Sequence, residues 1–317
     1  MGSTFTQQEW SAALIDDLRQ LVRLSVREDI EDQYDWTTVA TVPLDKLGAA
    51  DIVIRQTGVV AGVQIAELVF DEMSIDSEVR ILVADGDVVE AGTTAVSLSA
   101  LAVDLLTAER IILNFMGRLC GIATQTSEYV KLLAGTGVTV YDTRKTTPGW
   151  RRLEKYATRC GGAVNHRNGL NDAILIKDNH LAACAATLSG DDNSDVIGDA
   201  IEKSRELIQA VVAAGNAIDA AMPIEVEVDT LAQLQIALSH HPDIVLLDNM
   251  SHDQLRSAVA MRSDVAPEVQ LEASGGVTHQ TIRAIAETGV DRISVGALTH
   301  SATSLDVALD WTSVGSD

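Results

Sequence analysis

The sequence contains few aromatic residues, and this shortage constrains how its core is built. Phe, Trp and Tyr make up 3% of the 317 residues, whereas 46% of the residues are apolar. Alanine, valine, leucine and isoleucine must therefore fill a large interior, which is typical of helices packed on a parallel sheet. The length predicts one large domain or two of moderate size.

Basic residues, cysteines and long apolar stretches are also scarce. Twenty-three Lys+Arg against 46 Asp+Glu give a net charge of −23, which argues against nucleic acid or an anionic membrane as a partner. Cys120, Cys160 and Cys184 lack C-x-x-C spacing, so we expect reduced thiols and no zinc site in a cytoplasmic protein. The N-terminus is polar, and every apolar run is too short for a membrane helix.

The first part of the chain combines helical and strand patterns. Apolar residues at helical spacing predict helices over 7–30, about 62–73 and 101–133. Between about 45 and 100, short β-rich runs are punctuated by glycine-containing turns, which indicates several short strands.

After about residue 135 the pattern becomes a regular alternation of strands and helices. Such alternation implies a parallel sheet with right-handed crossovers, closed into a barrel or a partial barrel. Strands are expected at 138–142, 173–176, 223–228, 244–247, 269–273 and 292–295. Helices are expected at about 150–161, 198–215, 230–240, 251–262 and 278–288, and a polar loop or frayed helix start at 186–196.

Chemically distinct residues follow the apolar strands, where a parallel barrel carries its active site. A single charged strand end is usually a helix cap or a solvated charge, but convergence of six such ends favours function. The segments are Thr143-Arg144-Lys145, Lys177-Asp178-Asn179-His180, Glu225 to Asp229, Asp248-Asn249, Ser274-Gly275-Gly276 and Gly296.

The residue types indicate which ligands such a site accepts. Five potential cations, Arg144, Lys145, His166, Arg167 and Lys177, would repel one another unless a polyanion lay between them. Glu227 and Asp248 offer the hard oxygen ligands that suit Mg²⁺. The glycine-rich turns offer backbone N–H groups to phosphate. The residues alone therefore predict a phosphorylated substrate, a divalent metal and a second, carboxylated anion.

One long segment connects these residues to a known family. The stretch from 142 to 180 reads DTRKTTPGWRRLEKYATRCGGAVNHRNGLNDAILIKDNH and closely resembles quinolinate phosphoribosyltransferases. The resemblance includes LLTAERIILNFMGRLCGIAT (105–124), IEVEVDT, DIVLLDNM, LEASGGV and DRISVGALTHS, and covers nearly all of residues 50–301. It weakens at 28–38, where Asp32-Gln33-Tyr34-Asp35 replaces a glycine-containing acidic turn of the family.

The resemblance implies an α/β fold with two domains and a shared active site. It implies an N-terminal α/β sandwich with linking helices (1–130) and an incomplete, about seven-stranded α/β barrel (131–300). A C-terminal helix (301–317) would pack back on the first domain. The family forms tight homodimers, and the Arg of its ER motif, here Arg110, would reach into the neighbouring active site.

The resemblance also implies a reaction and residue roles. Phosphoribosyl pyrophosphate and quinolinate would give nicotinate mononucleotide, pyrophosphate and CO₂, in de novo NAD biosynthesis. Arg144, His166, Arg167 and Lys177 would surround the two carboxylates, and Lys145 would contact the donor. Glu227 and Asp248 would lie near the ribose hydroxyls and Mg²⁺. The phosphate-binding segments would contain Ser274, Gly275, Gly276, Gly296 and His300.

Three alternatives remain open at this stage. A paralogue could use nicotinate or serve molybdenum transport, although a monocarboxylate would leave cations unpaired. An aldolase-type barrel could use Lys177 as a Schiff base. A non-catalytic binding protein could retain the same scaffold. For Cys120 and Cys160 we expect only packing roles.

Overall fold

The computed structural model describes residues 5–31, 33–185, 195–214 and 222–312. The chain divides into two compact units, each assembled from segments that are distant in the sequence. The barrel unit comprises Met1–Gln7, Tyr129–Arg144 and Val164–Ala297. The sandwich unit comprises Gln8–Glu128, Lys145–Ala163 and Leu298–Asp317. Residues 145–163, expected in the barrel domain, therefore belong to the sandwich unit.

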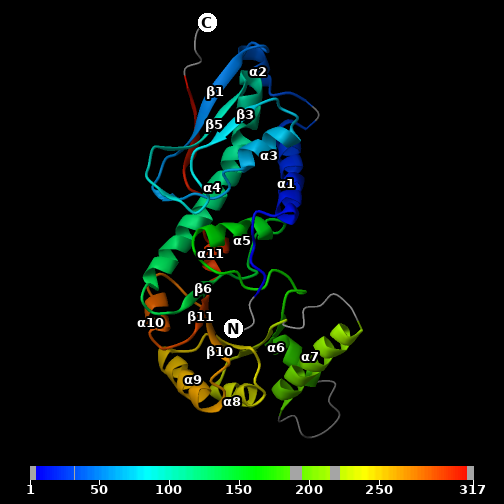
Figure 1. Cartoon of the computed structure of the whole chain (residues 1–317), viewed down its shortest axis with the longest axis vertical. Helices are drawn as coiled ribbons and strands as arrows, with labels where there is room; N and C mark the ends of the chain where they lie inside the picture. The colour runs from blue at the N-terminus through cyan, green and yellow to red at the C-terminus, as the bar shows by residue number, and fades with distance from the viewer. Residues whose placement is uncertain (1–4, 32, 186–194, 215–221, 313–317) are drawn as a thin grey trace. The chain divides into compact units, whose positions relative to one another are not determined.

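The barrel unit contains a parallel sheet of six described strands, where about seven were expected. The strand order is β6-β11-β10-β9-β8-β7, so the first strand in the sequence pairs with the last. β6 and β7 form the two edges of this sheet, so the barrel is open between them. Figure 1 shows β6, β11 and β10 of the sheet. The strands are β6 (Thr139–Tyr141), β7 (Ile174–Ile176), β8 (Ile224–Val228), β9 (Ile244–Asp248), β10 (Gln270–Ser274) and β11 (Arg292–Ser294).

Helices separate these strands, as the alternation predicts. They are α6 (Asp178–Ala185), α7 (Val196–Ala213), α8 (Leu231–Ser239), α9 (His252–Val265) and α10 (Ile282–Ala286). The short α11 (Ala297–His300) follows the last strand, β11. Capping boxes fix where two of them begin: Thr230 with Gln233 for α8, and Ser251 with Gln254 for α9. The sequence analysis did not anticipate α6, which begins directly at Asp178 after β7. Most of the expected loop at 186–196 lies outside the described residues.

The sandwich unit contains a four-stranded antiparallel sheet in the order β12-β1-β5-β3. Its strands are β1 (Leu47–Ile54), β3 (Glu78–Ile81), β5 (Thr93–Leu101) and β12 (Val307–Trp311), and a separate pair joins β2 (Gly58–Val59) to β4 (Val88–Val89). The helices are α1 (Ala12–Ile30), α2 (Trp36–Thr41), α3 (Ile65–Glu72), α4 (Ala102–Leu132), which runs on into the barrel unit, and α5 (Arg151–Cys160). Leu14, Leu18 and Val22 of α1 are buried in the same aliphatic core as Ile52 and Val96.

The C-terminal segment differs from the sequence-based expectation. The expected helix over 301–317 is wrong for its described part, because residues 307–311 form β12 and pair antiparallel with β1. The exposed edge of β1 supplies hydrogen-bond partners over five residues, and such long-range pairing overrides local propensity.

Two smaller features complete the sandwich unit. The atypical 28–38 region leads into α2, whose first turn is capped by the side chain of Asp35, which accepts from the Thr38 backbone N–H. Within the described residues, no helix combines the length and the apolar character that crossing a membrane would need.

Candidate active site

The carboxyl ends of the barrel strands bring most of the predicted site residues to one edge of the sheet. Arg144 follows β6, Lys177 follows β7, Glu227 lies near the end of β8, and Asp248 and Ser274 end β9 and β10. The parallel pairing aligns Asp248 directly with Ser274. The prediction that these residues share one edge is confirmed, whereas their individual roles remain predictions.

Two arginines at this edge, Arg144 and Arg167, lie within electrostatic reach of each other. Arg167 is 6% exposed, and its guanidinium donates to the Ala173 carbonyl over 3.2 Å. Burial, and then the neighbouring charge of Arg144, lower the pKa of Arg167. Among the described residues, the buried Nε atoms of Arg144 and Arg167 have no hydrogen-bond partner. Such a pair favours a ligand that carries negative charge.

The imidazole of His166 is held from both sides by protein atoms. Its Nδ1 accepts from the backbone N–H of Arg167 over 2.8 Å, so the hydrogen-bond pattern places the proton on Nε2. Nε2 lies 3.0 Å from the carboxylate of Glu225 and 3.5 Å from that of Glu272. The ring stacks on Phe5 with centroids 4.3 Å apart. His166 therefore orients the backbone of Arg167 from inside the barrel.

The carboxylates below His166 belong to a buried charged group that the sequence analysis did not identify. Glu225 and Glu272 are completely buried, and Arg292 is 2% exposed. The Nε of Arg292 lies 3.3 Å from Glu272, and its guanidinium stacks over the Tyr141 ring at 3.8 Å. Positively charged groups thus lie beside acids that would be costly to bury alone.

The pKa values of Glu225 and Glu272 shift in opposite directions in this environment. Burial alone would raise the pKa of Glu225, but His166, Arg292 and Arg167 outweigh burial and lower it. Burial raises the pKa of Glu272, and the attraction of His166 does not compensate. Neighbouring carboxyl groups with opposite shifts are typical of a shared buried charge.

This group contains the residue types of a metal site, but the ring nitrogen that would bind the metal carries a proton. One ligand atom each from His166, Glu225 and Glu272 lies within 4.8 Å of the others, the one such trio in the described part of the chain. A ring nitrogen that carries a proton cannot bind a metal, and Arg292 already balances charge here. We therefore interpret the group as an internal ion network.

The remaining polar residues at the edge include the predicted metal ligands. Lys177 forms an ion pair with Glu227, and Asp248 accepts from the side-chain amide of Asn249 over 2.7 Å. Gly275 has φ +92°, and a Cβ atom there would lie 2.2 Å from the Asn249 amide oxygen. Only glycine fits at this turn, because of its positive φ and the close approach of Asn249.

Three predicted residues lie in the sandwich unit instead. Arg110 is on α4 with a side chain 65% exposed, 3.8 Å from Glu109. Lys145 is exposed, and its carbonyl accepts from the Thr299 hydroxyl over 2.8 Å. His300 contacts the Ser301 hydroxyl over 2.7 Å.

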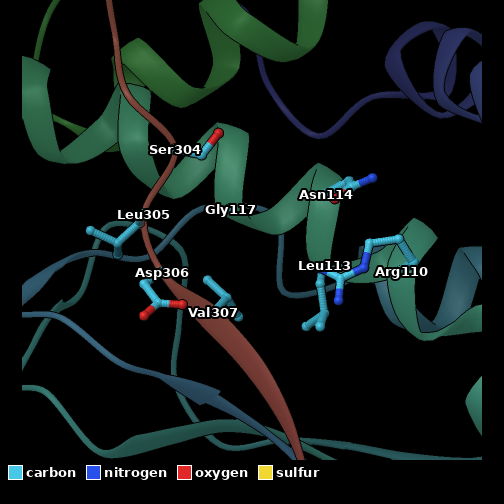
Figure 2. Close-up of a pocket in the computed structure, with 8 residues that line it drawn as sticks. All are labelled: Arg110, Leu113, Asn114, Gly117, Ser304, Leu305, Asp306 and Val307. Atoms are coloured by element: carbon cyan, nitrogen blue, oxygen red, sulfur yellow. The ribbon is translucent and has the colours of Figure 1, made fainter.

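Arg110 borders a cavity of about 310 Å³ within the sandwich unit. Figure 2 shows Arg110, Leu113, Asn114 and Gly117 on α4, opposite the segment Ser304–Val307 that leads into β12. The cavity therefore lies between one face of α4 and the start of the edge strand.

Comparison with known proteins identifies the family. The family model for the C-terminal domain of quinolinate phosphoribosyl transferase matches residues 122–310, and the N-terminal domain model matches residues 35–120. The chain belongs to the quinolinate phosphoribosyltransferase family. This membership makes it a phosphoribosyltransferase, and it confirms the resemblance found in the sequence.

Individual members of the quinolinate phosphoribosyltransferase family agree over nearly the full chain. A nicotinate-nucleotide pyrophosphorylase (carboxylating) of Mycobacterium leprae is 43% identical over 93% of this chain and 97% of its own. A mitochondrial quinolinate phosphoribosyltransferase (decarboxylating) of Nicotiana tabacum is 33% identical over 92% of this chain and 82% of its own. The solved nicotinate-nucleotide pyrophosphorylase of Francisella tularensis superimposes with a TM-score of 0.83 at 35% identity, covering 98% of this chain and 100% of its own.

Proposed function

We propose that the carboxyl edge of the barrel binds quinolinate between Arg144 and Arg167. The chain catalyses its family's reaction, the transfer of a phosphoribosyl group from phosphoribosyl pyrophosphate to quinolinate with loss of CO₂. The observation that carries the proposal is the neighbouring charge of Arg144 and the buried Arg167, whose Nε atoms have no hydrogen-bond partner among the described residues. A ligand with two adjacent carboxylates balances both charges, whereas nicotinate would balance only one.

The reaction needs positioning and electrostatic stabilisation rather than a nucleophilic side chain. Pyrophosphate leaves C1 of the ribose, and the carboxylates of Glu227 and Asp248 stabilise the cationic sugar that develops. The ring nitrogen of quinolinate forms the new bond to C1 while the arginines hold its carboxylates. The nitrogen is then positively charged, so the neighbouring C–CO₂ bond breaks. Its electron pair stays on the ring carbon and takes up a proton.

The acidic residues at the edge fit a magnesium ion. Glu227 and Asp248 provide two hard oxygen donors on the adjacent strands β8 and β9. Two carboxylates suit an ion that retains water and binds substrate phosphate. When bound, Mg²⁺ neutralises charge on the departing pyrophosphate. Lys177, which follows the adjacent strand β7, forms an ion pair with Glu227.

We assign donor binding to Lys145, His300 and the glycine turns. Lys145 supplies a mobile point charge for the phosphates. Ser274, Gly275, Gly276 and Gly296 offer backbone N–H groups at the ends of β10 and β11, where barrels commonly bind phosphate. His166, with both ring nitrogens directed at protein atoms, supports Arg167 behind the substrate carboxylates.

The protein is proposed to work as a homodimer in the cytoplasm, with Arg110 completing the neighbouring site. The exposed guanidinium beside an open cavity supports this, because its near charge, Glu109, lies 3.8 Å away (Figure 2). The three free cysteines are consistent with a reducing compartment. The high negative charge disfavours nucleic acid and anionic membranes as partners.

Subunit complementation tests the role of Arg110. Arg110→Ala and Arg167→Ala homodimers should each lose at least ~10²-fold in kcat/KM, the scale of a lost charged contact. A co-expressed heterodimer of these variants, isolated through two affinity tags, should regain about half of the wild-type rate because one of its two sites is intact.

The same heterodimer can also contradict the proposed role of Arg110 in the neighbouring site. If Arg110 acts within its own subunit, both sites of the heterodimer remain defective and no activity returns. Substituting Arg55, an exposed sandwich-unit arginine paired with Asp310, by alanine provides the matched control. An Arg55→Ala homodimer should keep nearly the wild-type rate, since such surface pairs contribute little.

A further inference from the structure

A buried ion pair in the sandwich unit lies next to two segments assigned to donor binding. Glu154 of α5 is completely buried, and the side chain of Arg118 on α4 is 22% exposed. One oxygen of Glu154 accepts from Arg118 Nη2 over 2.7 Å and from Nε over 3.2 Å. A carboxylate at this depth is costly unless hydrogen bonds satisfy it, and here they do.

The same carboxylate also fixes the segment that contains Lys145. The backbone N–H of Thr147 donates to Glu154 over 3.1 Å, and the Thr147 hydroxyl donates over 2.9 Å. Glu154 thus receives four hydrogen bonds from Arg118 and Thr147 together. Thr147 is two residues after Lys145, so this anchor restricts the backbone on that side of the lysine.

Arg118 fixes a second segment with its remaining donors. Its Nη1 donates to the carbonyl of Ala302 over 2.7 Å, and Nη2 donates to that of Thr299 over 2.5 Å. The backbone here also lies directly on α4, because a Cβ atom at Gly121 would be 2.0 Å from the Thr303 carbonyl oxygen. The segment that contains His300 therefore has little freedom to shift.

One further hydrogen bond links the two segments directly to each other. The Thr299 hydroxyl donates to the Lys145 carbonyl over 2.8 Å. The path runs from Lys145 to Thr299, Arg118, Glu154 and Thr147, and returns along the chain to Lys145. Both segments that carry predicted donor ligands are thus tied to one buried ion pair.

We propose that Arg118 and Glu154 are positioning residues that hold Lys145, together with the 299–302 segment, in the geometry that binds phosphoribosyl pyrophosphate. The inference rests on the donor-binding role assigned to Lys145. A stabilising role alone would not require this arrangement, because apolar residues often replace buried ion pairs without loss of stability. The planar Arg fork suits the task, since it binds the carboxylate and two carbonyls at once.

Two conservative variants test the clamp formed by Arg118 and Glu154. Glu154→Gln keeps one acceptor oxygen but replaces the other by an amide donor, which cannot accept from Thr147 or Arg118. Thr299→Val removes only the hydroxyl that binds the Lys145 carbonyl. Each variant should raise KM for phosphoribosyl pyrophosphate, by ~10-fold for Glu154→Gln and by a few-fold for Thr299→Val. KM for quinolinate should change less than about two-fold.

Tyr156→Phe is the matched control for general destabilisation. It removes a 2.6 Å hydrogen bond to Asp85 from the same helix, α5, without touching the clamp. Its thermal unfolding midpoint should fall as much as that of Thr299→Val, while both KM values stay near wild type. Equal changes in both KM values of Glu154→Gln and Thr299→Val would overturn the proposal.

A double-mutant cycle with Lys145→Ala tests whether the effect of Thr299→Val on kcat/KM acts through Lys145. If the clamp acts through Lys145, Thr299→Val should have little further effect on kcat/KM in the Lys145→Ala background. An undiminished effect would contradict the clamp. If Lys145→Ala is impaired but the clamp variants are not, only the clamp fails. If Lys145→Ala alone matches wild type, the role of Lys145 is wrong, and the clamp is rejected with it.

Discussion

Replacing Arg167 by alanine is expected to lower kcat/KM for quinolinate by at least ~10²-fold, the scale of a lost charged contact in the transition state. Arg167 is buried beside Arg144, and both guanidinium groups retain an unpartnered Nε in the described part of the chain. Steady-state rates at saturating donor would measure the loss.

Thermal unfolding separates a lost substrate contact from a lost fold. Burial and then Arg144 lower the pKa of Arg167, whereas Glu225 and Asp172 attract its charge. If Arg167→Ala unfolds cooperatively at a temperature well above that of the assay, its lost rate reflects the missing guanidinium. Arg256→Ala removes an exposed arginine from the same unit, where it pairs with Asp253, and should leave the rate unchanged. Near-normal turnover by Arg167→Ala would reject the proposed quinolinate site.

Lys145→Ala is expected to cause the second large loss, again at least ~10²-fold in kcat/KM. The lysine is exposed, and its carbonyl accepts a hydrogen bond from the Thr299 hydroxyl. We expect the loss mainly as a higher KM for phosphoribosyl pyrophosphate. Lys145→Arg should recover part of the rate, because it keeps the charge but changes the shape of the donor group.

A second exposed lysine in the sandwich unit provides the control. Lys46 lies just before β1, and Lys46→Ala should leave both KM values unchanged. An unchanged KM for the donor in Lys145→Ala, with fold and quinolinate affinity intact, would remove Lys145 from the proposed donor site.

The local sequence pattern predicts the barrel better than the sandwich unit. All six strands expected after residue 135 are present within a residue or two of their predicted bounds, because each is a short apolar run followed by a polar or glycine-rich turn. The same pattern predicts that Arg144, Lys177, Glu227, Asp248 and Ser274 share an edge, since parallel strands end together.

Features that depend on long-range partners could not be predicted in the same way. Residues 307–311 form a strand because β1 offers them an edge, and nothing within VALDW specifies that partner. Glu225, Glu272 and Arg292 look like ordinary charged strand residues until the barrel interior brings them together. Phe5 likewise packs on His166, which lies in a distant part of the sequence.

The contact between Arg118 and Glu154 could not be predicted from the sequence either. Arg118 and Glu154 are separated by 36 positions and belong to different helices, α4 and α5. Their sequence spacing predicts no contact, because only residues three or four apart are neighbours on one helix. Burial of the carboxylate, which the sequence does not reveal, is what distinguishes this pair from a surface salt bridge.

The most direct test of the account measures both products in a single reaction. The purified protein is mixed with quinolinate, phosphoribosyl pyrophosphate and Mg²⁺, and nicotinate mononucleotide and CO₂ are followed together. Parallel reactions replace quinolinate by nicotinate or remove the metal with a chelator. The account predicts equal amounts of both products from quinolinate with Mg²⁺, and little product without metal or from nicotinate. Turnover of nicotinate in preference to quinolinate, or full activity after metal removal, would contradict it.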